Sequence, residues 1–224
     1  MMRREPEPEL MDDDFEAEAY ARADFSVVNE AFVDRLLELT VPLAGTAVEA
    51  VDLGTGPGDI PIRVSRKRPS WRIVAVDASA PMLSHARHAA IEAGLGDRIR
   101  WELADAKDTH LPDGDFDVIF SNSILHHVNE TGVFWGEVKR LARPGAICLL
   151  RDLARPPSKQ AALDIVQRYA SGESNLLQEE FYRSLLSAYT VEEVRRQLGR
   201  ASLAGLEVAM VTDRHLDVFG RFGP

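Results

Sequence analysis

Three glycines at alternate positions follow an apolar run in the first quarter of the chain. The segment reads Val51-Asp52-Leu53-Gly54-Thr55-Gly56-Pro57-Gly58-Asp59. Glycine adopts positive φ without a steric penalty, and it lets bare backbone approach a ligand closely. Asp77 ends the next apolar run, a position from which a carboxylate can bind the diol of a ribose. Together the two features predict a cradle for a nucleoside-like cofactor at the ends of two strands.

The charges around this loop favour one cofactor over another. A dinucleotide site prefers Gly-x-Gly-x-x-Gly and rests its pyrophosphate on free amides at a helix N-terminus. Here Asp59 directly follows the last glycine. Its carboxylate would compete with a pyrophosphate for the positive end of the helix, and each such interaction with the helix dipole is worth about 0.3–1 kcal/mol. Asp52 adds negative charge. We therefore expect S-adenosylmethionine, which carries a sulfonium, an ammonium and a ribose diol but no phosphate. NAD, or a turn that serves chain geometry alone, stays as an alternative.

Strands and helices alternate around the loop, as hydrophobic periodicity and helix-stop residues indicate. The predicted strands are residues 48–53, 72–77, 98–103, 115–121 and 146–152, and the predicted helices are residues 25–39, 59–68, 80–93 and 130–143. Five strands with crossover connections imply a doubly wound parallel sheet. Its ligand crevice should lie at the carboxyl ends of the strands.

The last third of the chain changes character. Two helical patterns lie within residues 162–169 and 181–189, and a third helix starts at Thr190, which has capping-box spacing with Glu193. Residues 205–212 and 214–219 look like strands joined too tightly for a crossover, so they should pair as an antiparallel hairpin. The expected fold class is α/β, a doubly wound seven-stranded sheet that is mostly parallel, with an antiparallel terminal hairpin. Helical segments stand at the N-terminal side and after the fifth strand.

The distribution of charge indicates how the chain is divided and which partners it is expected to bind. Residues 1–24 hold nine acids against three arginines, which is −6 of the net charge of −10. We expect an acidic, partly mobile lead over residues 1–24 and a single Rossmann-like domain over residues 25–224, with residues 154–190 as a helical lid. The negative charge argues against a broad phosphate-binding surface, so no nucleic-acid partner is expected.

A single cysteine, Cys148, lies in an apolar run and should be an inert core thiol. It excludes an internal disulfide framework and a multi-cysteine metal cluster. No run approaches the roughly 20 apolar residues that span a bilayer. A cytoplasmic location without a membrane span is expected, and the oligomeric state is left open.

Five motifs in order carry a resemblance to a known family. They are residues 51–58, Val76-Asp77-Ala78-Ser79 with Met82-Leu83, Ala104-Asp105-Ala106 before Leu111-Pro112, Phe116-Asp117-Val118-Ile119 and Leu141-Ala142-Arg143-Pro144-Gly145. The chain resembles class I S-adenosylmethionine-dependent methyltransferases over residues 46–152. It is most similar to the small-molecule branch that includes ubiquinone/menaquinone C-methyltransferases, although it departs from that branch at residues 150–156.

The resemblance implies a set of cofactor contacts. The backbone around Gly54, Thr55, Gly56 and Gly58 would contact the methionine part, with Asp52 near its ammonium. Asp77 would bind the ribose hydroxyls. The remaining contacts would be Ala78 and Met82 with the adenine faces, Asp105 and Ala106 with the adenine edge, and Ser121 and Asn122 beneath the sulfonium.

Methyl transfer from a sulfonium is an in-line displacement that needs a nucleophile about 3–3.5 Å from the methyl group. His126 and His127 follow the fourth strand and are the candidate catalytic residues. On a helix they would diverge by about 100°, so at most one should face substrate. They would make a poor metal pair, and no metal site is expected. Candidate substrate contacts are Tyr20, Arg151, Asp152, Tyr169 and Tyr182.

These residues predict metal-independent methyl transfer to a small, partly apolar acceptor. Two alternatives stay open. One is an RNA or protein methyltransferase, for which Arg63, Arg66, Lys67 and Arg68 could supply a basic surface. The other is a non-catalytic module that binds S-adenosylmethionine.

Overall fold

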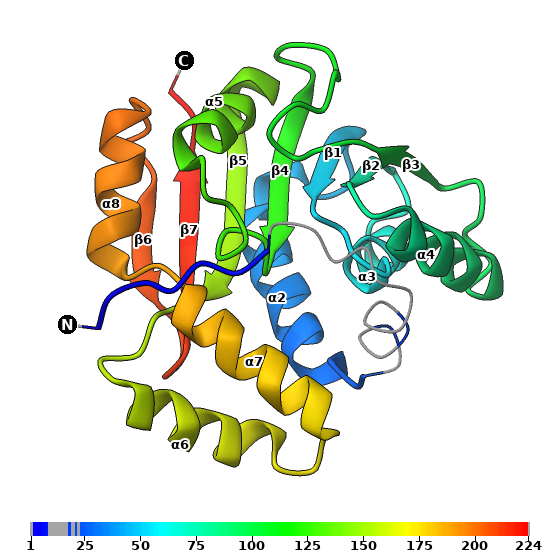
Figure 1. Cartoon of the computed structure of the whole chain (residues 1–224). Coiled ribbons are helices and arrows are strands. Elements are labelled where there is room, and N and C mark those ends of the chain that lie inside the picture. Colours follow the sequence, from blue (N-terminus) through cyan, green and yellow to red (C-terminus); the bar gives the residue numbers. More distant parts are fainter. Residues whose placement is uncertain (1, 9–17, 19–20, 22, 224) are drawn as a thin grey trace.

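The computed structural model describes residues 2–8, 18, 21 and 23–223, and Figure 1 shows the whole chain. Within the described residues one seven-stranded sheet has the order β3-β2-β1-β4-β5-β7-β6. The strands are β1 Val48–Leu53, β2 Trp71–Asp77, β3 Ile99–Leu103, β4 Phe116–Asn122, β5 Ala142–Leu153, β6 Glu207–Met210 and β7 His215–Arg221. Strands β1 to β5 run parallel to one another, whereas β7 runs antiparallel to both β5 and β6.

Helices cover both faces of the sheet. In the described part of the chain they are α2 Ser26–Leu39, α3 Asp59–Lys67, α4 Ala80–Glu92, α5 Thr131–Leu141, α6 Lys159–Ala170, α7 Asn175–Ser187 and α8 Val191–Arg200, with a 3-10 turn η1 at Val41–Leu43. No helix among these residues combines the length and the apolar character needed to cross a bilayer.

Alternating side chains of the strands form the two main layers of the core. In β1, Val48 and Ala50 join the cluster beneath α2, α3 and α4, while Val51 and Leu53 join the cluster beneath α5 and α8. A strand with both faces covered reads as a continuous apolar run, which is the pattern of residues 146–150 in β5. The doubly wound arrangement and the antiparallel terminal hairpin are therefore confirmed.

A third, smaller cluster lies beyond the carboxyl end of β5. Helices α6 and α7 pack against each other through Ala162, Val166 and Leu185, and Leu153 joins them from the end of β5. Figure 1 shows this helical pair at the end of the sheet where the parallel strands point. The next helix, α8, begins after Thr190, and its predicted capping box with Glu193 is present.

The boundary between α5 and β5 differs from the sequence-based expectation. The helix predicted to continue to residue 143 ends at Leu141, and β5 begins directly at Ala142. Ala142 pairs with Phe116, and the register then shifts before Val118 pairs with Ile147. Gly145 adopts φ of +78° within this irregular stretch. The Pro144-Gly145 pair therefore marks a bulge inside the strand rather than the end of the helix.

Candidate active site

The glycine loop joins β1 to α3 and is tied to the neighbouring strand. The backbone N–H groups of Gly54 and Thr55 both donate to the Val76 carbonyl at 2.9 Å. Gly54 has φ of +72°, and a Cβ atom there would lie 2.5 Å from Cδ1 of Ile124. Gly56 has φ of +54° and would meet nothing within 4 Å. The loop is thus tightly packed at its start and open at Gly56, where a ligand can approach the backbone.

Asp77 closes this loop from the end of β2. Its Oδ2 accepts the N–H of Gly56 at 2.7 Å, and its Oδ1 accepts the N–H of Ser79 at 2.9 Å. Burial raises the pKa of Asp77, although these backbone donors oppose the rise. The carboxylate is therefore oriented by the protein backbone at the rim of the cradle, as binding of a ribose diol requires.

Asp52 lies deeper, with 2% of its surface exposed. Its Oδ2 accepts a hydrogen bond of 2.7 Å from the Thr55 hydroxyl. Burial, with a further contribution from the charge of Asp77, raises the pKa of Asp52 to about 7 against the opposing effect of Thr55. A carboxyl group with such a pKa becomes more acidic when a cation binds beside it.

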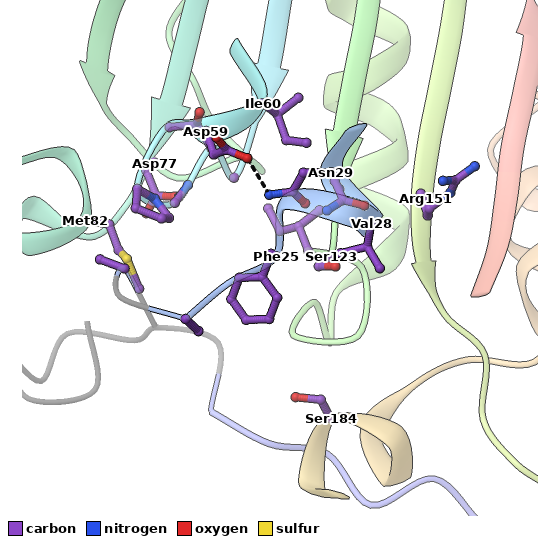
Figure 2. Close-up of a pocket in the computed structure, with 18 of the residues that line it drawn as sticks. Phe25, Val28, Asn29, Asp59, Ile60, Asp77, Met82, Ser123, Arg151 and Ser184 are labelled. Carbon is purple, nitrogen blue, oxygen red and sulfur yellow. Dashed lines mark hydrogen bonds between the residues drawn. The ribbon is translucent and has the colours of Figure 1, made fainter. Parts of the chain in front are cut away.

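A side-chain carboxylate lies in the first turn of α3. Oδ2 of Asp59 accepts from Nδ2 of Asn29 at 2.8 Å and from Nε of Arg63 at 2.7 Å (Figure 2). This carboxylate adds negative charge near the end of the helix that a pyrophosphate would approach. The loop and its three carboxylates therefore fit a cationic, phosphate-free nucleoside such as S-adenosylmethionine better than a dinucleotide.

A cavity of about 980 Å³ opens at the carboxyl ends of β1, β2 and β4. Ten of the twelve predicted cofactor residues line it: Asp52, Gly54, Thr55, Gly56, Asp77, Ala78, Met82, Asp105, Ala106 and Asn122. Gly58 instead precedes α3 and would place a Cβ 2.8 Å from that of Ala86. Ser121 is buried, and its hydroxyl donates to the Leu53 carbonyl at 2.5 Å. These two residues support the strand ends without lining the cavity.

Helices α2 and α7 build the other side of this cavity. Figure 2 shows Asp77 and Met82 on one side, Arg151 on the other, and Ser184 of α7 across from them. The additional lining is mainly apolar and includes Phe25, Val28, Leu176, Leu177 and Phe181. The same hollow thus combines a polar, cofactor-sized cradle with an apolar region.

His126 and His127 both line the cavity. The chain forms a turn rather than a helix over residues 125–127, and the two imidazole centroids lie 4.1 Å apart. We expected at most one histidine to face substrate because adjacent side chains on a helix point about 100° apart. Residues 125–127 are not helical, so this restriction does not apply to them. Ser123, with φ of +63°, begins the turn after β4.

The histidines contact carboxylates on opposite sides. Asp152 accepts from Nδ1 of His126 at 2.6 Å, and Oε1 of Glu7 lies 3.4 Å from Nε2 of His126 and 3.3 Å from Nδ1 of His127. One donor atom each of Glu7, His126 and His127 lies within 4.8 Å of the others.

The predicted substrate residues lie in different surroundings. Arg151 lines the cavity, but its guanidinium is held by Asp217 of β7 at 2.7 and 2.9 Å. Asp152 is absent from the cavity wall and contacts His126. Tyr169 lines the rim and donates to Asp213 at 2.7 Å. Tyr182 packs against the α6–α7 cluster, and Tyr20 lies outside the described residues.

Two groups of site residues were missed from sequence. The apolar residues of α2 and α7 follow the same periodicity as core residues, so only the folded cavity separates the two. Glu7 and Arg4 come from the acidic lead, where no helical or strand pattern marks a position. The only available signal was the alternation of glutamate and proline over residues 5–8.

Comparison with known proteins supports the chemistry suggested by this geometry. A family described as a methyltransferase domain matches residues 51–150. The chain is 30% identical over 176 residues to an uncharacterized methyltransferase of Mycobacterium tuberculosis. The alignment covers 77% of this chain and 85% of the relative. It is also 30% identical over 123 residues to a ubiquinone/menaquinone biosynthesis C-methyltransferase of Desulfotalea psychrophila, covering 55% of this chain and 48% of that relative.

A solved structure agrees with the fold. An S-adenosylmethionine-dependent methyltransferase from Aquifex aeolicus matches with a TM-score of 0.68 at 20% identity, over 94% of this chain and 98% of that one. The resemblance drawn from the five motifs is thereby confirmed. The chain belongs to the class I S-adenosylmethionine-dependent methyltransferases, is similar to the ubiquinone/menaquinone C-methyltransferases, and uses S-adenosylmethionine as its cofactor.

Proposed function

We propose that this enzyme transfers the methyl group of S-adenosylmethionine to a small, partly apolar acceptor by in-line displacement, with no metal in the step. The observation that carries the proposal is that one cavity of about 980 Å³ is lined both by the glycine loop and by apolar residues of α2 and α7. Small-molecule sites typically measure about 300–1,000 Å³ and are mostly apolar with a few fixed polar groups.

The cofactor would occupy the side of the cavity formed by β1, β2 and β4. Asp77 would bind the ribose hydroxyls, and the backbone from Gly54 to Gly56 would bind the methionine part beside Asp52. Ala78 and Met82 would contact the adenine faces, with Asp105 and Ala106 at its edge and Asn122 beneath the sulfonium. Bound there, S-adenosylmethionine supplies an electrophilic methyl group on a positively charged sulfur.

The acceptor would lie between this cradle and the helices that follow β5. Leu176, Leu177 and Phe181 offer an apolar surface, which supports an acceptor with an apolar part. We propose that residues 154–190 act as the lid of a single domain over residues 25–224. Closing such a site excludes water and holds the nucleophile in line with the methyl group.

The protein residues nearest to acid–base work are His126 and His127. A base is needed only when the acceptor atom must lose a proton, and it then contributes about 10²–10⁴-fold. Arg151 and Tyr169 would meet polar parts of the acceptor, although each already has a carboxylate partner, Asp217 and Asp213 respectively.

Charge pairing supports a small acceptor over a nucleic acid. Arg63 pairs with Glu30 and Asp59, and Lys67 pairs with Glu30 and Asp34. Binding of a phosphate backbone depends on cations that are free to release counterions, and these acids on α2 and α3 pair with two of the four basic residues in the 63–68 cluster. We place the reaction in the cytoplasm, where a chain with a single buried cysteine is common.

Two measurements test the proposal. Calorimetry should detect S-adenosylhomocysteine binding, whereas NADH should give no heat. A screen of small amines, phenols, thiols and quinols with methyl-labelled S-adenosylmethionine should then yield a labelled product, with RNA and histone-type peptides as parallel arms. Label only in RNA or peptide would overturn the acceptor class. Tight cofactor binding with no product from any arm would favour a non-catalytic module.

A further inference from the structure

The two cavity-lining histidines differ in what their ring nitrogens contact. Both belong to the turn after β4, and both lie against the N-terminal segment, residues 2–8 (Figure 1, dark blue). Asp152 of β5 lies within hydrogen-bond distance of His126, and the carbonyl oxygen of Pro8 lies within hydrogen-bond distance of His127. The chemical nature of each partner determines where the hydrogens on the two rings must be.

His126 has a carboxylate at each nitrogen. Nδ1 lies 2.6 Å from Oδ1 of Asp152, and Nε2 lies 3.4 Å from Oε1 of Glu7. An ionised carboxylate only accepts hydrogen bonds, so the ring satisfies both partners when both nitrogens carry a hydrogen. Burial opposes a charge on His126, but Asp152 and then Glu7 outweigh it and raise the pKa, with Arg4 opposing them. These contacts therefore favour the imidazolium form of the His126 ring.

His127 has a different set of partners. Its Nδ1 lies 3.1 Å from the Pro8 carbonyl oxygen and 3.3 Å from Oε1 of Glu7. A carbonyl oxygen only accepts, so Nδ1 must carry the hydrogen. Burial and the charge of His126 lower the pKa of His127 to about 3, although Asp152 opposes this. The ring is then neutral, with the lone pair on its Nε2.

Glu7 itself is fixed in this position. Its side chain is 6% exposed, and the Ser184 hydroxyl donates to Oε1 at 3.2 Å. Its backbone N–H donates to the hydroxyl of Ser187 at 3.2 Å. Burial raises the pKa of Glu7, His126 and Ser184 lower it, and Glu180 and Asp152 add to the rise.

Arg4 anchors the segment that carries Glu7. Its guanidinium donates to the Ser187 carbonyl at 2.6 Å, to the His126 carbonyl at 2.8 Å and to Oδ1 of Asn129 at 2.8 Å. It also lies 4.2 Å above the ring of Tyr189. The N-terminal segment is thus bound both to the end of α7 and to the turn of the histidines, which gives Glu7 a defined place at the acceptor side of the site.

We propose that Glu7 is a positioning residue that assigns different roles to the two histidines. His126 stays an imidazolium that braces the turn between Asp152 and Glu7. His127, held through its Nδ1–H, presents an unprotonated Nε2 to the acceptor and accepts a hydrogen bond from its N–H or O–H group. The role of His127 rests on the proposed function, whereas the two protonation states do not.

Histidine NMR tests the assignment without knowledge of the acceptor. The protein is labelled with ¹⁵N-histidine, and the two signals are assigned with His126→Gln and His127→Gln. At pH 7 the wild type should show His126 with both nitrogens protonated and His127 neutral, with its hydrogen on Nδ1. Glu7→Gln should lower the pKa of His126. Glu5→Gln is the matched control, because Glu5 lies on the same segment but pairs with the exposed Lys159, and it should leave His126 unchanged.

Several results would overturn the proposal. They are a neutral His126 at pH 7, a His127 with its hydrogen on Nε2, or a pKa of His126 that Glu7→Gln leaves unchanged. Stoichiometric Zn²⁺ uptake by the wild type that Glu7→Gln abolishes would make the cluster a metal site instead. The protonation states of both histidines are read from the wild-type spectra, so this part of the test does not depend on how the Glu7→Gln variant folds. Calorimetry with S-adenosylhomocysteine reports separately on the proposed function.

Discussion

The carboxylate of Asp77 accepts a hydrogen bond from the backbone N–H of Gly56 at 2.7 Å. The end of β2 therefore holds the glycine loop that follows β1, and the same carboxylate faces the cavity. Asp77→Asn keeps an oxygen that can accept from Gly56 but removes the negative charge. We expect calorimetry to show at least about a tenfold loss of S-adenosylhomocysteine affinity, because charge-assisted hydrogen bonds are worth about 1.5–3 kcal/mol. Asp97→Asn, at an exposed position, should bind normally, and equal affinities would remove Asp77 from the ribose site.

Gly54→Ala should damage the loop. The new methyl group would lie 2.5 Å from Cδ1 of Ile124, and a residue other than glycine at positive φ costs about 1–2 kcal/mol. We expect thermal unfolding to occur several degrees lower, with weaker S-adenosylhomocysteine binding. Gly199→Ala provides the contrast, since Gly199 lies within α8 with nothing nearby. That change should stabilise the protein by about 0.5–1 kcal/mol; similar losses in both variants would contradict this account.

The buried Asp52 should make stability depend on pH. Its pKa is about 7 in the folded protein and about 3.9 in an unfolded chain. Between these values the folded state keeps a proton that the unfolded state has released, so the Asp52 contribution falls as pH rises. The total loss is at most about 4 kcal/mol. Urea unfolding from pH 4.5 to 8 should show Asp52→Asn gaining stability relative to wild type as pH increases. A constant difference across the range would refute the buried-acid interpretation.

The ion pair between Arg151 and Asp217 should respond strongly to removal of one partner. Asp217 has no exposed surface and accepts two hydrogen bonds from the guanidinium. Asp217→Ala should cost about 3–5 kcal/mol, because it leaves a buried charge without a partner. The double variant Arg151→Met with Asp217→Leu should cost less than the single change.

A surface pair is the control for this cycle. Arg72 pairs with Glu49 across β1 and β2 with its own side chain mostly exposed, and such pairs are worth about 0–1 kcal/mol. Denaturant titrations of Glu49→Ala and Asp217→Ala should therefore differ several-fold in lost stability. Equal losses would show that burial does not govern the inner pair.

Cys148 should be unreactive while the protein is folded. It is fully enclosed in β5, and burial raises the pKa of its thiol to about 12. Since the thiolate is the reactive form, a disulfide reagent should label Cys148 only after denaturant is added. Labelling of the native protein faster than global unfolding would indicate local opening of β5.

The strands and most of the helices were predictable because their residues carry local signals. The stretch from Ala146 to Leu150 is apolar at every position, and Thr190 with Glu193 marks a helix start within four residues. The start of β5 was not predictable, because Ala142 becomes strand by pairing with Phe116 on another strand. Such long-range pairing leaves no mark in the local sequence.

The site divides in the same way. The glycine loop and Asp77 are adjacent to predicted strand ends, and they were found because glycine spacing and terminal carboxylates are local patterns. Arg151 and Asp217 are 66 positions apart, and Glu7 is more than a hundred positions from His126. Their partnership depends on the antiparallel insertion of β7 beside β5 and on the path of the N-terminal segment, which only the folded chain reveals.

The anchorage of Arg4 has a practical consequence for protein production. Because its guanidinium is bound beneath the histidine turn, an affinity tag fused ahead of it would have to be accommodated next to the acceptor side of the cavity. Among the residues that the structure describes, Phe222 is the last buried one, and Gly223 beyond it is exposed. We therefore expect an affinity tag at the carboxyl terminus to leave the cavity unchanged.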